Sequence, residues 1–228
     1  MYNKVTLMGK QNTAKKPPKG SVRFSLSLSP EQKSAKQAIL HHPYNFMVGK
    51  AGSGKTLLAC QIALDLFFKR EINKIIITRP TVSTEDNGFL PGSEREKMEP
   101  WLVPIRSNMR KVYNKPEKLE AMEKDETIEL VSLAHFRGRT FDNSVVIVDE
   151  FQNLTRSQLA MAVGRLGKDS KMIFCGDSYQ IDLKDKNYSA YHDMAKLINS
   201  EYVFKCVLED SHRHDAIDDL LELLNGYH

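Results

Sequence analysis

The fold of this chain is decided by the stretch Gly49-Lys50-Ala51-Gly52-Ser53-Gly54-Lys55-Thr56. The stretch fits the pattern Gly-x-x-x-x-Gly-Lys-Thr of a phosphate-binding loop. Its glycines let successive backbone N–H groups turn inward around an anion, which a Cβ atom would obstruct. In such a loop Lys55 reaches the β- and γ-phosphates, and the Thr56 hydroxyl ligates Mg²⁺. All eight residues are therefore candidates for binding a nucleoside triphosphate.

The residues on either side of the loop have the periodicities that this motif requires. Residues 44–48 form an apolar run of strand length, and apolar residues recur at helical spacing from Leu57 to Phe67. Strand, glycine loop and helix is the order in which the motif occurs, and the helix adds the positive end of its dipole to the phosphate site. A glycine turn beside a surface lysine, the alternative, would not require this order.

Strand and helix patterns alternate along the rest of the chain. This alternation predicts a three-layer α/β fold with a mostly parallel sheet, in which ligands bind at the carboxyl ends of the strands. The run 75–78 is apolar on both faces, as expected for a strand that helices cover on both sides. Further strand candidates lie at 128–131, 145–148, 172–175 and 202–207, and helical patterns at 155–165, 187–199 and 215–225.

Residues 80–126 break this alternation. They carry five prolines, many charges and the only tryptophan, Trp101. We interpret them as a Pro-rich insertion with one or two helices, starting from Glu94 and from Pro116. Trp101 suits packing, and stacking on a nucleic acid base is the alternative.

Two acids end the apolar run Val145-Val146-Ile147-Val148-Asp149-Glu150. Downstream of a phosphate loop, this pattern indicates the Walker B element. Asp149 would hold the Mg²⁺ shell, and Glu150 would orient and polarise the attacking water. Adjacent residues at a strand end point apart, so the two acids can take two roles. A solvated strand end is the alternative.

Two more polar segments follow strand candidates. In Gly176-Asp177-Ser178-Tyr179-Gln180, the Gln180 amide can bond the γ-phosphate or the attacking water, although a plain polar turn would look similar. Arg213 follows the last strand candidate and can act as an arginine finger on the transferring phosphoryl group, with a surface arginine as the alternative. The flanking His212 and His214 lack a set of partner ligands, so we assign no metal site there.

Gln32 lies ahead of the first strand candidate, in Ser29-Pro30-Glu31-Gln32. A Gln amide can bond the N6/N7 edge of adenine, which makes Gln32 a candidate base contact. Ser29 can equally cap a helix that has Pro30 at its first position, and the two roles are compatible.

The net charge of +4 is unevenly distributed. Residues 1–36 carry eight Lys or Arg and one acid, and the remaining 192 residues carry 25 basic and 28 acidic residues. A basic N-terminal arm, residues 1–28, suits attraction to nucleic acid phosphates, with a solvated, disordered arm as the alternative.

Three widely spaced cysteines, no signal peptide and no apolar run near 18 residues favour a soluble, cytoplasmic protein without membrane contact.

Together these motifs resemble the PhoH family of cytosolic ATPases over about residues 29–225, which we expect to form one domain. Phe151 stands where that family usually has alanine after the paired acids, and we expect little effect on the Mg²⁺ chemistry. The residues that carry the resemblance are Ser29–Gln32, Gly49–Thr56, Thr78-Arg79-Pro80, Gly88-Phe89-Leu90-Pro91-Gly92, His135-Phe136-Arg137-Gly138-Arg139-Thr140, Asp149-Glu150-Phe151-Gln152-Asn153, Gly176–Leu183 and Arg213-His214.

The resemblance implies a RecA-like P-loop NTPase, similar to the first motor half of superfamily 1 helicases, that hydrolyses ATP and does RNA-linked work. It also favours a hexameric ring, in which Arg213, Arg137 or Arg139 would complete the site of a neighbouring subunit. The leading hypothesis is an Mg²⁺-dependent ATPase coupled to nucleic acid as a helicase or remodeller. The alternative is a nucleotide-gated ring assembly or binding protein with slow hydrolysis. A small-molecule kinase is disfavoured because Asp149, Glu150 and Gln180 suit water as the acceptor.

Overall fold

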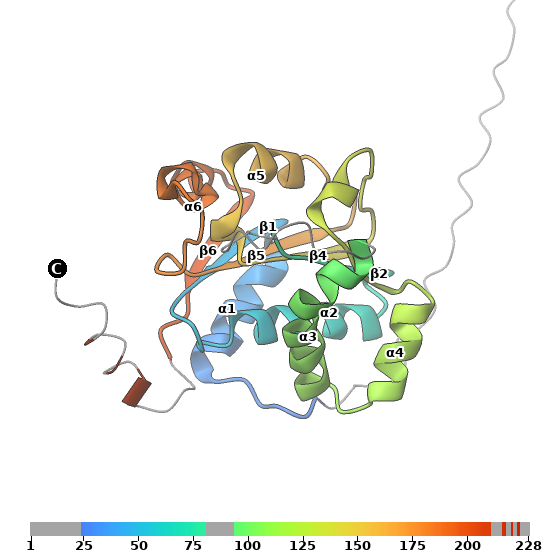
Figure 1. Ribbon diagram of the computed structural model, residues 1–228. Coiled ribbons are helices and arrows are strands. Elements are labelled where there is room, and N and C mark those ends of the chain that lie inside the picture. Colours follow the sequence, from blue (N-terminus) through green and yellow to red (C-terminus); the bar gives the residue numbers. More distant parts are fainter. Residues whose placement is uncertain (1–23, 81–93, 211–215, 218–219, 221–222, 224–228) are drawn as a thin grey trace, which may run out of the picture.

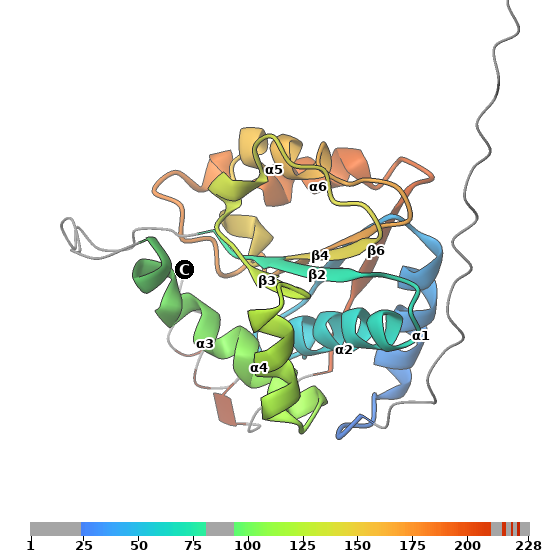
Figure 2. The same cartoon turned by 90° about the vertical axis from the view of Figure 1, so that its right-hand side faces the viewer.

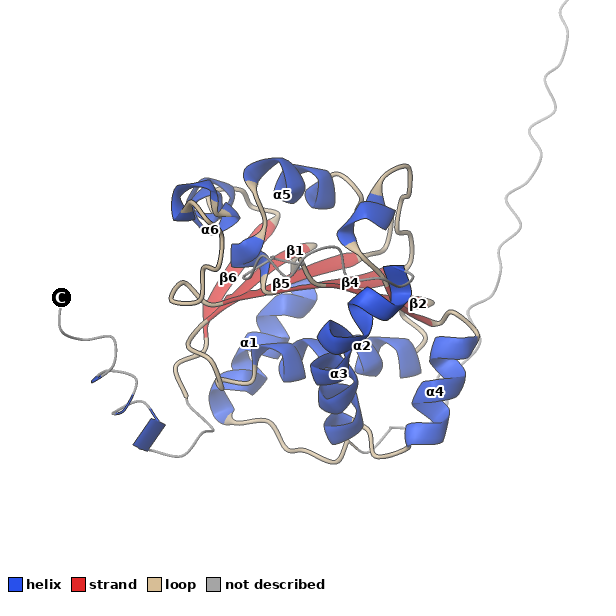
Figure 3. Cartoon of the chain, viewed as in Figure 1, coloured by secondary structure: helices blue, strands red, loops and turns tan. Residues whose placement is uncertain are grey.

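The computed structural model describes residues 24–80 and 94–210, together with residues 216, 217, 220 and 223 (Figure 1). A six-stranded sheet forms its middle layer, and every strand pairs in parallel with its neighbours (Figure 3). The strands are β1 (Tyr44–Val48), β2 (Lys74–Thr78), β3 (Ile128–Leu130), β4 (Ser144–Asp149), β5 (Lys171–Gly176) and β6 (Val203–Val207), in the order β3-β2-β4-β5-β1-β6.

Helices cover both faces of the sheet, as the alternating pattern predicts. Helices α1 to α4 lie below the sheet in Figures 1 and 2, and α5 and α6 lie above it. The helices are α1 (Pro30–His41), α2 (Lys55–Phe68), α3 (Glu94–Val112), α4 (Pro116–Lys124), α5 (Arg156–Val163) and α6 (Ala190–Leu197), with short 3-10 turns η1 (Leu133–Phe136), η2 (Phe151–Asn153) and η3 (Lys186–Tyr188).

Strand β2 shows how the sheet separates two hydrophobic cores. Ile75 and Ile77 belong to the core between the sheet and helices α1 to α4, whereas Ile76 belongs to the core between the sheet and helices α5 and α6. All three side chains are fully buried. Successive side chains of a strand point to opposite faces, so a run that is apolar throughout fits only a strand with both faces covered.

Two helix starts depend on local capping. Ser29 and Gln32 form a reciprocal capping box at α1, with Pro30 in the first turn, which confirms the predicted cap. The helix expected over 187–199 is shorter in the structure. Because Ser189 accepts a hydrogen bond from Tyr191 N as the N-cap, α6 begins at Ala190, and the preceding residues form the separate turn η3.

The insertion contains two helices, α3 and α4, that begin at Glu94 and Pro116 as predicted. Helix α3 packs against α2 and so reaches the side of the molecule where the phosphate loop lies. Several predictions fall outside the described residues: most of the arm (1–23), the Gly-Phe-Leu-Pro-Gly run, the Trp101 side chain, Arg213 and most of the helix expected at 215–225. Within the described part of the chain, no helix is long and apolar enough to cross a bilayer.

Candidate nucleotide site

Two glycines of the phosphate loop are required by its backbone. Gly49 N donates to the Gly176 carbonyl at 3.3 Å, and a Cβ atom at Gly49 would lie 2.2 Å from the Leu208 carbonyl oxygen. Gly54 is the N-cap of α2 and has a left-handed backbone, with φ 82°. The loop therefore leads from β1 into α2, whose first N–H groups form an anion-binding end.

Lys55 bends back over this loop. Its ammonium donates to the carbonyl oxygens of Gly49 at 2.7 Å and Lys50 at 2.9 Å, and to the Ser53 hydroxyl at 3.4 Å. Oxygens of the loop thus hold the charge beside the backbone that would surround a phosphate.

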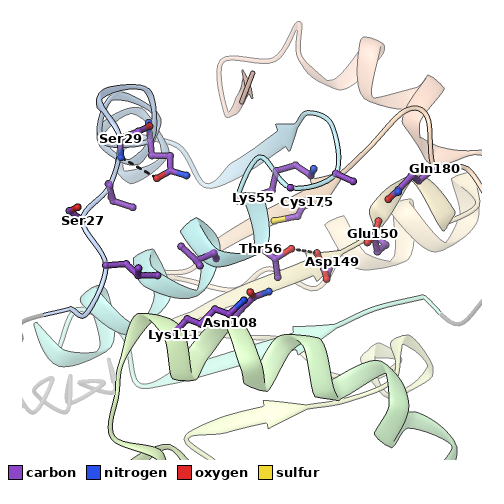
Figure 4. A pocket seen from close by; sticks show the side chains of 17 residues that line it. Ser27, Ser29, Lys55, Thr56, Asn108, Lys111, Asp149, Glu150, Cys175 and Gln180 are labelled. Atoms are coloured by element: carbon purple, nitrogen blue, oxygen red, sulfur yellow. Dashed lines mark hydrogen bonds between the residues drawn. The ribbon is translucent and has the colours of Figure 1, made fainter. Parts of the chain in front are cut away.

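The sheet order brings the paired acids next to the loop. Strands β1 and β4 both pair with β5, where Cys175 stands opposite Met47 on one side and Asp149 on the other. The carboxyl ends of the three strands are therefore level. The Thr56 hydroxyl donates to Asp149 Oδ1 at 2.7 Å (Figure 4), so the two predicted metal ligands are in contact.

Asp149 is a buried carboxyl group with an altered acidity. Burial, followed by the negative charge of Glu150, raises the pKa of Asp149 to about 6. The bond from Thr56 and the charge of Arg79 act in the opposite direction. Arg79 Nη1 lies 3.9 Å from Asp149 Oδ2. A cation next to Asp149 would favour its ionised form.

The pair of oxygen groups fits a magnesium ion. Mg²⁺ prefers oxygen ligands and is usually held by one or two protein groups plus phosphates and waters. The Thr56 hydroxyl and the Asp149 carboxylate provide such groups at the end of α2. Among the described residues, no cluster of three or more His, Cys, Asp or Glu could hold a metal ion.

Glu150 is held in place by neighbouring groups. Its backbone is left-handed, with φ 52°. Gln152 Nε2 donates to Glu150 Oε2 at 2.7 Å and to the Gln180 carbonyl at 2.9 Å, while Gln152 Oε1 accepts from Asp177 N at 3.2 Å. Arg79 Nη2 lies 3.5 Å from Glu150 Oε1. The fully buried Gln152 therefore joins the second acid to the segment that carries Gln180.

Gly176 leaves room for this arrangement. A Cβ atom there would lie 2.5 Å from a ring carbon of Phe151 and 2.9 Å from Gln152 Oε1. We expect Gly176→Ala to lower the free energy of unfolding by about 1–3 kcal/mol because both buried groups must move. Thermal or denaturant unfolding measures this loss. Gly164→Ala is the matched control, since its nearest atom, the Ala160 carbonyl oxygen, would be at 3.4 Å; equal losses in both variants would contradict the explanation.

Gln32 lies at the edge of the same site. Its Oε1 accepts from Ser29 N at 3.2 Å, and its Nε2 is 3.5 Å from the Ser53 carbonyl. The amide therefore supports both α1 and the phosphate loop. Contact between Gln32 and an adenine base stays a prediction.

Arg137 and Arg139, two of the three candidate arginine fingers, lie in different surroundings. Arg139 Nη2 is 2.7 Å from Glu129 Oε2, and the Arg139 guanidinium lies over the Phe141 ring. Arg137 is exposed, beside a hollow of about 290 Å³. Neither side chain lines the cavity at the phosphate loop.

One cavity of about 720 Å³ joins the loop, the acids and the insertion helix. Figure 4 shows its lining, with Lys55, Thr56, Asp149 and Glu150 along one part and Asn108 and Lys111 on α3. This volume is typical of small-molecule sites. The lining residues are Leu26, Ser27, Leu28, Ser29, Gln32, Ala51, Gly52, Gly54, Lys55, Thr56, Leu57, Asn108, Lys111, Asp149, Glu150, Cys175 and Gln180.

Four residues of this site have no individual role that a sequence motif indicates. Arg79 follows β2, so the rule that polar residues gather at strand ends could have identified it. Gln152 follows the paired acids by two residues, and its buried amide had no separate signal. Asn108 and Lys111 lie on an insertion helix whose packing against α2 no motif indicates.

A glycine loop between a strand and a helix, with a Thr–Asp pair and a second acid at a nearby strand end, defines a P-loop nucleotide-binding protein. The family model "PhoH-like protein" matches residues 26–225. The chain is 38% identical to a PhoH-like protein of Synechocystis over 190 residues, covering 82% of this chain and 58% of the relative. It is 39% identical to a PhoH-like protein of Bacillus subtilis over 181 residues, covering 78% of this chain and 56% of the relative. The chain belongs to the PhoH family.

The chain spans less than two thirds of the length of these relatives. Two solved structures share its fold. One is the large terminase of a thermophilic bacteriophage, with a TM-score of 0.52, 10% identity and coverage of 86% of this chain and 50% of that chain. The other is the Sulfolobus solfataricus SWI2/SNF2 ATPase core in complex with dsDNA, with a TM-score of 0.50 and 14% identity. The match covers 81% of this chain and 45% of that chain. At these identities the likeness shows the fold alone.

Proposed function

We propose that this chain is an Mg²⁺-dependent ATPase. The observation that supports this most directly is the 2.7 Å contact between Thr56 and Asp149 at the start of α2, with Glu150 beside it. A nucleotide site without catalysis needs the loop but has no use for a second, separately held acid. Release of phosphate from ATP and Mg²⁺ without any added acceptor tests the activity and argues against a kinase.

Each protein group has a defined role in the proposed hydrolysis. The loop N–H groups and Lys55 bind the β- and γ-phosphates. Bound Mg²⁺, held through Thr56 and Asp149, would neutralise charge on the phosphate oxygens. Gln152 and Arg79 fix the Glu150 carboxylate from two sides. In this position Glu150 orients the attacking water and accepts its proton as the general base. Gln180 bonds the γ-phosphate or the water at the same edge of the sheet.

The proposed coupling is to nucleic acid, with RNA as the first partner to test. Residues 1–23 carry six Lys or Arg and no acid, and residues 26–29, which follow them closely in the chain, line the nucleotide cavity. This short separation along the chain supports the proposal that polyanion binding by the arm is coupled to the nucleotide site. If single-stranded RNA raises the ATPase rate several-fold, the remodeller is supported. If RNA neither binds nor stimulates, the alternative of a nucleotide-gated assembly replaces it.

Truncation tests the arm directly. We expect deletion of residues 1–23 to weaken RNA binding and to flatten its salt dependence, because each phosphate contact contributes about 0.7 to the slope of log K against log salt for single strands. The deletion ends before Leu26 so that the cavity wall stays intact. Binding measured at several salt concentrations gives the slope. An unchanged slope would make the arm a solvated tail, and ATP affinity serves as the control for folding.

The proposed assembly is a homo-oligomeric ring, with a hexamer favoured. A head-to-tail interface closes when its rotation divides a circle. Arg139 is engaged by Glu129 in its own subunit, so Arg213 and Arg137 are the better candidates for acting in trans. Mixing Arg213→Ala with Glu150→Gln subunits should then restore some hydrolysis. Light scattering that shows only monomer, with and without nucleotide, would contradict the ring.

We place this assembly in the cytoplasm, where its three free cysteines would stay reduced.

A further inference from the structure

The nucleotide cavity continues beyond the residues that would bind phosphates and metal. Its inner part contains Lys55, Thr56 and Asp149. The outer part lies between α2, α3 and the segment 26–29, and α3 borders it with Asn108 and Lys111 (Figure 4). If the loop binds phosphates in the inner part, the remainder of the cavity is the space left beside them for the nucleoside.

The outer wall has both apolar and polar surfaces. Leu26, Leu28 and Leu57 line the cavity with aliphatic side chains, which suit the flat face of a base. This wall is anchored on the insertion. Ser25 N donates to the Val112 carbonyl at 2.9 Å, and Asn114 N donates to the Ser25 hydroxyl at 3.3 Å. The segment ahead of α1 is thus fixed to the C-terminal end of α3.

Asn108 and Lys111 are three residues apart and so share one face of α3. Within the described part of the chain, neither side chain has a hydrogen-bond or ion-pair partner. By contrast, Arg110 on the same turn pairs with Glu120 at 3.2 Å. The Gln32 amide already bonds Ser29 and approaches Ser53. The uncommitted polar side chains of the outer cavity are therefore Asn108 and Lys111 on α3, together with the short Ser27 hydroxyl on the segment 26–29.

We propose that Asn108 and Lys111 contact the base and ribose of the bound nucleotide and determine its base preference. This inference rests on the proposed function and names the part of the same site that selects the substrate. The loop binds phosphates, which are identical in all nucleoside triphosphates, so discrimination must arise in the outer cavity. The Asn108 amide offers the donor and acceptor that match N6 and N7 of adenine. The Lys111 ammonium offers only donors, which suit ribose hydroxyls and base acceptors.

Binding measurements separate the nucleoside contacts from the phosphate contacts. We would measure the affinities of ATP, GTP and inorganic tripolyphosphate, each with Mg²⁺, for wild type, Asn108→Ala and Lys111→Ala. Each variant should bind ATP about three- to tenfold more weakly, since one hydrogen bond is lost. Tripolyphosphate affinity should not change. Asn108→Ala should also narrow the preference for ATP over GTP. Lys33→Ala, an exposed lysine on α1 outside the cavity, is the matched control.

The outcomes distinguish this inference from the proposed function. If tripolyphosphate binds normally and both variants keep wild-type ATP affinity, α3 does not contact the nucleoside and the inference is overturned while the proposed function stands. If Lys111→Ala weakens tripolyphosphate as much as ATP, Lys111 binds phosphate and the assignment is also wrong. If wild type binds neither ATP nor tripolyphosphate, the proposed function fails, and the inference fails with it.

Discussion

Lys55→Ala is expected to reduce ATP hydrolysis by at least about a hundredfold, the typical effect of losing one preorganised charge-stabilising group. In the structure the Lys55 ammonium is held by the Gly49 and Lys50 carbonyl oxygens. It is therefore already placed beside the loop and need only exchange these acceptors for phosphate oxygens. The variant lacks that charge, so both ATP affinity and phosphate release should fall. Equilibrium binding and steady-state phosphate release measure the two effects.

The control for this variant is Lys69→Ala. Lys69 follows the other end of α2 and makes an exposed ion pair with Asp65 at 3.1 Å, so its loss should cost well under about 1 kcal/mol of stability and leave hydrolysis unchanged. Wild-type hydrolysis by Lys55→Ala would remove the phosphate loop from the mechanism. An equal loss in both lysine variants would point to a general effect on the fold.

Glu150→Gln should bind ATP and fail to turn it over. The substitution keeps the size of the side chain, and its amide oxygen can still accept the bond from Gln152 Nε2, which is 2.7 Å from the carboxylate in the native chain. What is lost is the negative charge that, in the proposed mechanism, would accept the proton of the attacking water. General-base catalysis typically contributes about 10²–10⁴-fold, so the turnover rate should fall by that factor.

Single-turnover measurements with bound ATP separate this effect from binding. ATP affinity should stay within a few-fold of wild type, and the amount of ATP retained by the protein after mixing should rise. Loss of affinity together with rate would instead give Glu150 a role in holding the nucleotide. Near-native turnover would show that another group activates the water.

The phosphate loop and the paired acids could be placed from the sequence because each depends on local pattern. The loop is specified by glycines at fixed spacing, and Asp149 and Glu150 end a β-branched apolar run that is typical of a buried strand. Their contact through Thr56 needed one more fact, the position of β5 between β1 and β4. Alternation of strands and helices predicts a parallel sheet but does not state the strand order.

The residues that remained without a role depend on contacts between distant parts of the chain. Gln152 acts through partners near Gln180, more than 20 residues away. Asn108 and Lys111 reach the cavity because α3 packs along α2, which follows from the shapes of two apolar surfaces and from no short motif. The arginine that would complete the site in trans belongs to this class as well, since its partner would lie on another subunit.

The left-handed backbone at Glu150 has a consequence for selection. An L-residue with a Cβ atom lowers the stability of the folded chain by about 1–2 kcal/mol in this conformation, and glycine or asparagine tolerates it better. A library screened only for resistance to heat should therefore drift toward those residues at position 150 and become inactive. The acid persists there only while turnover itself is under selection.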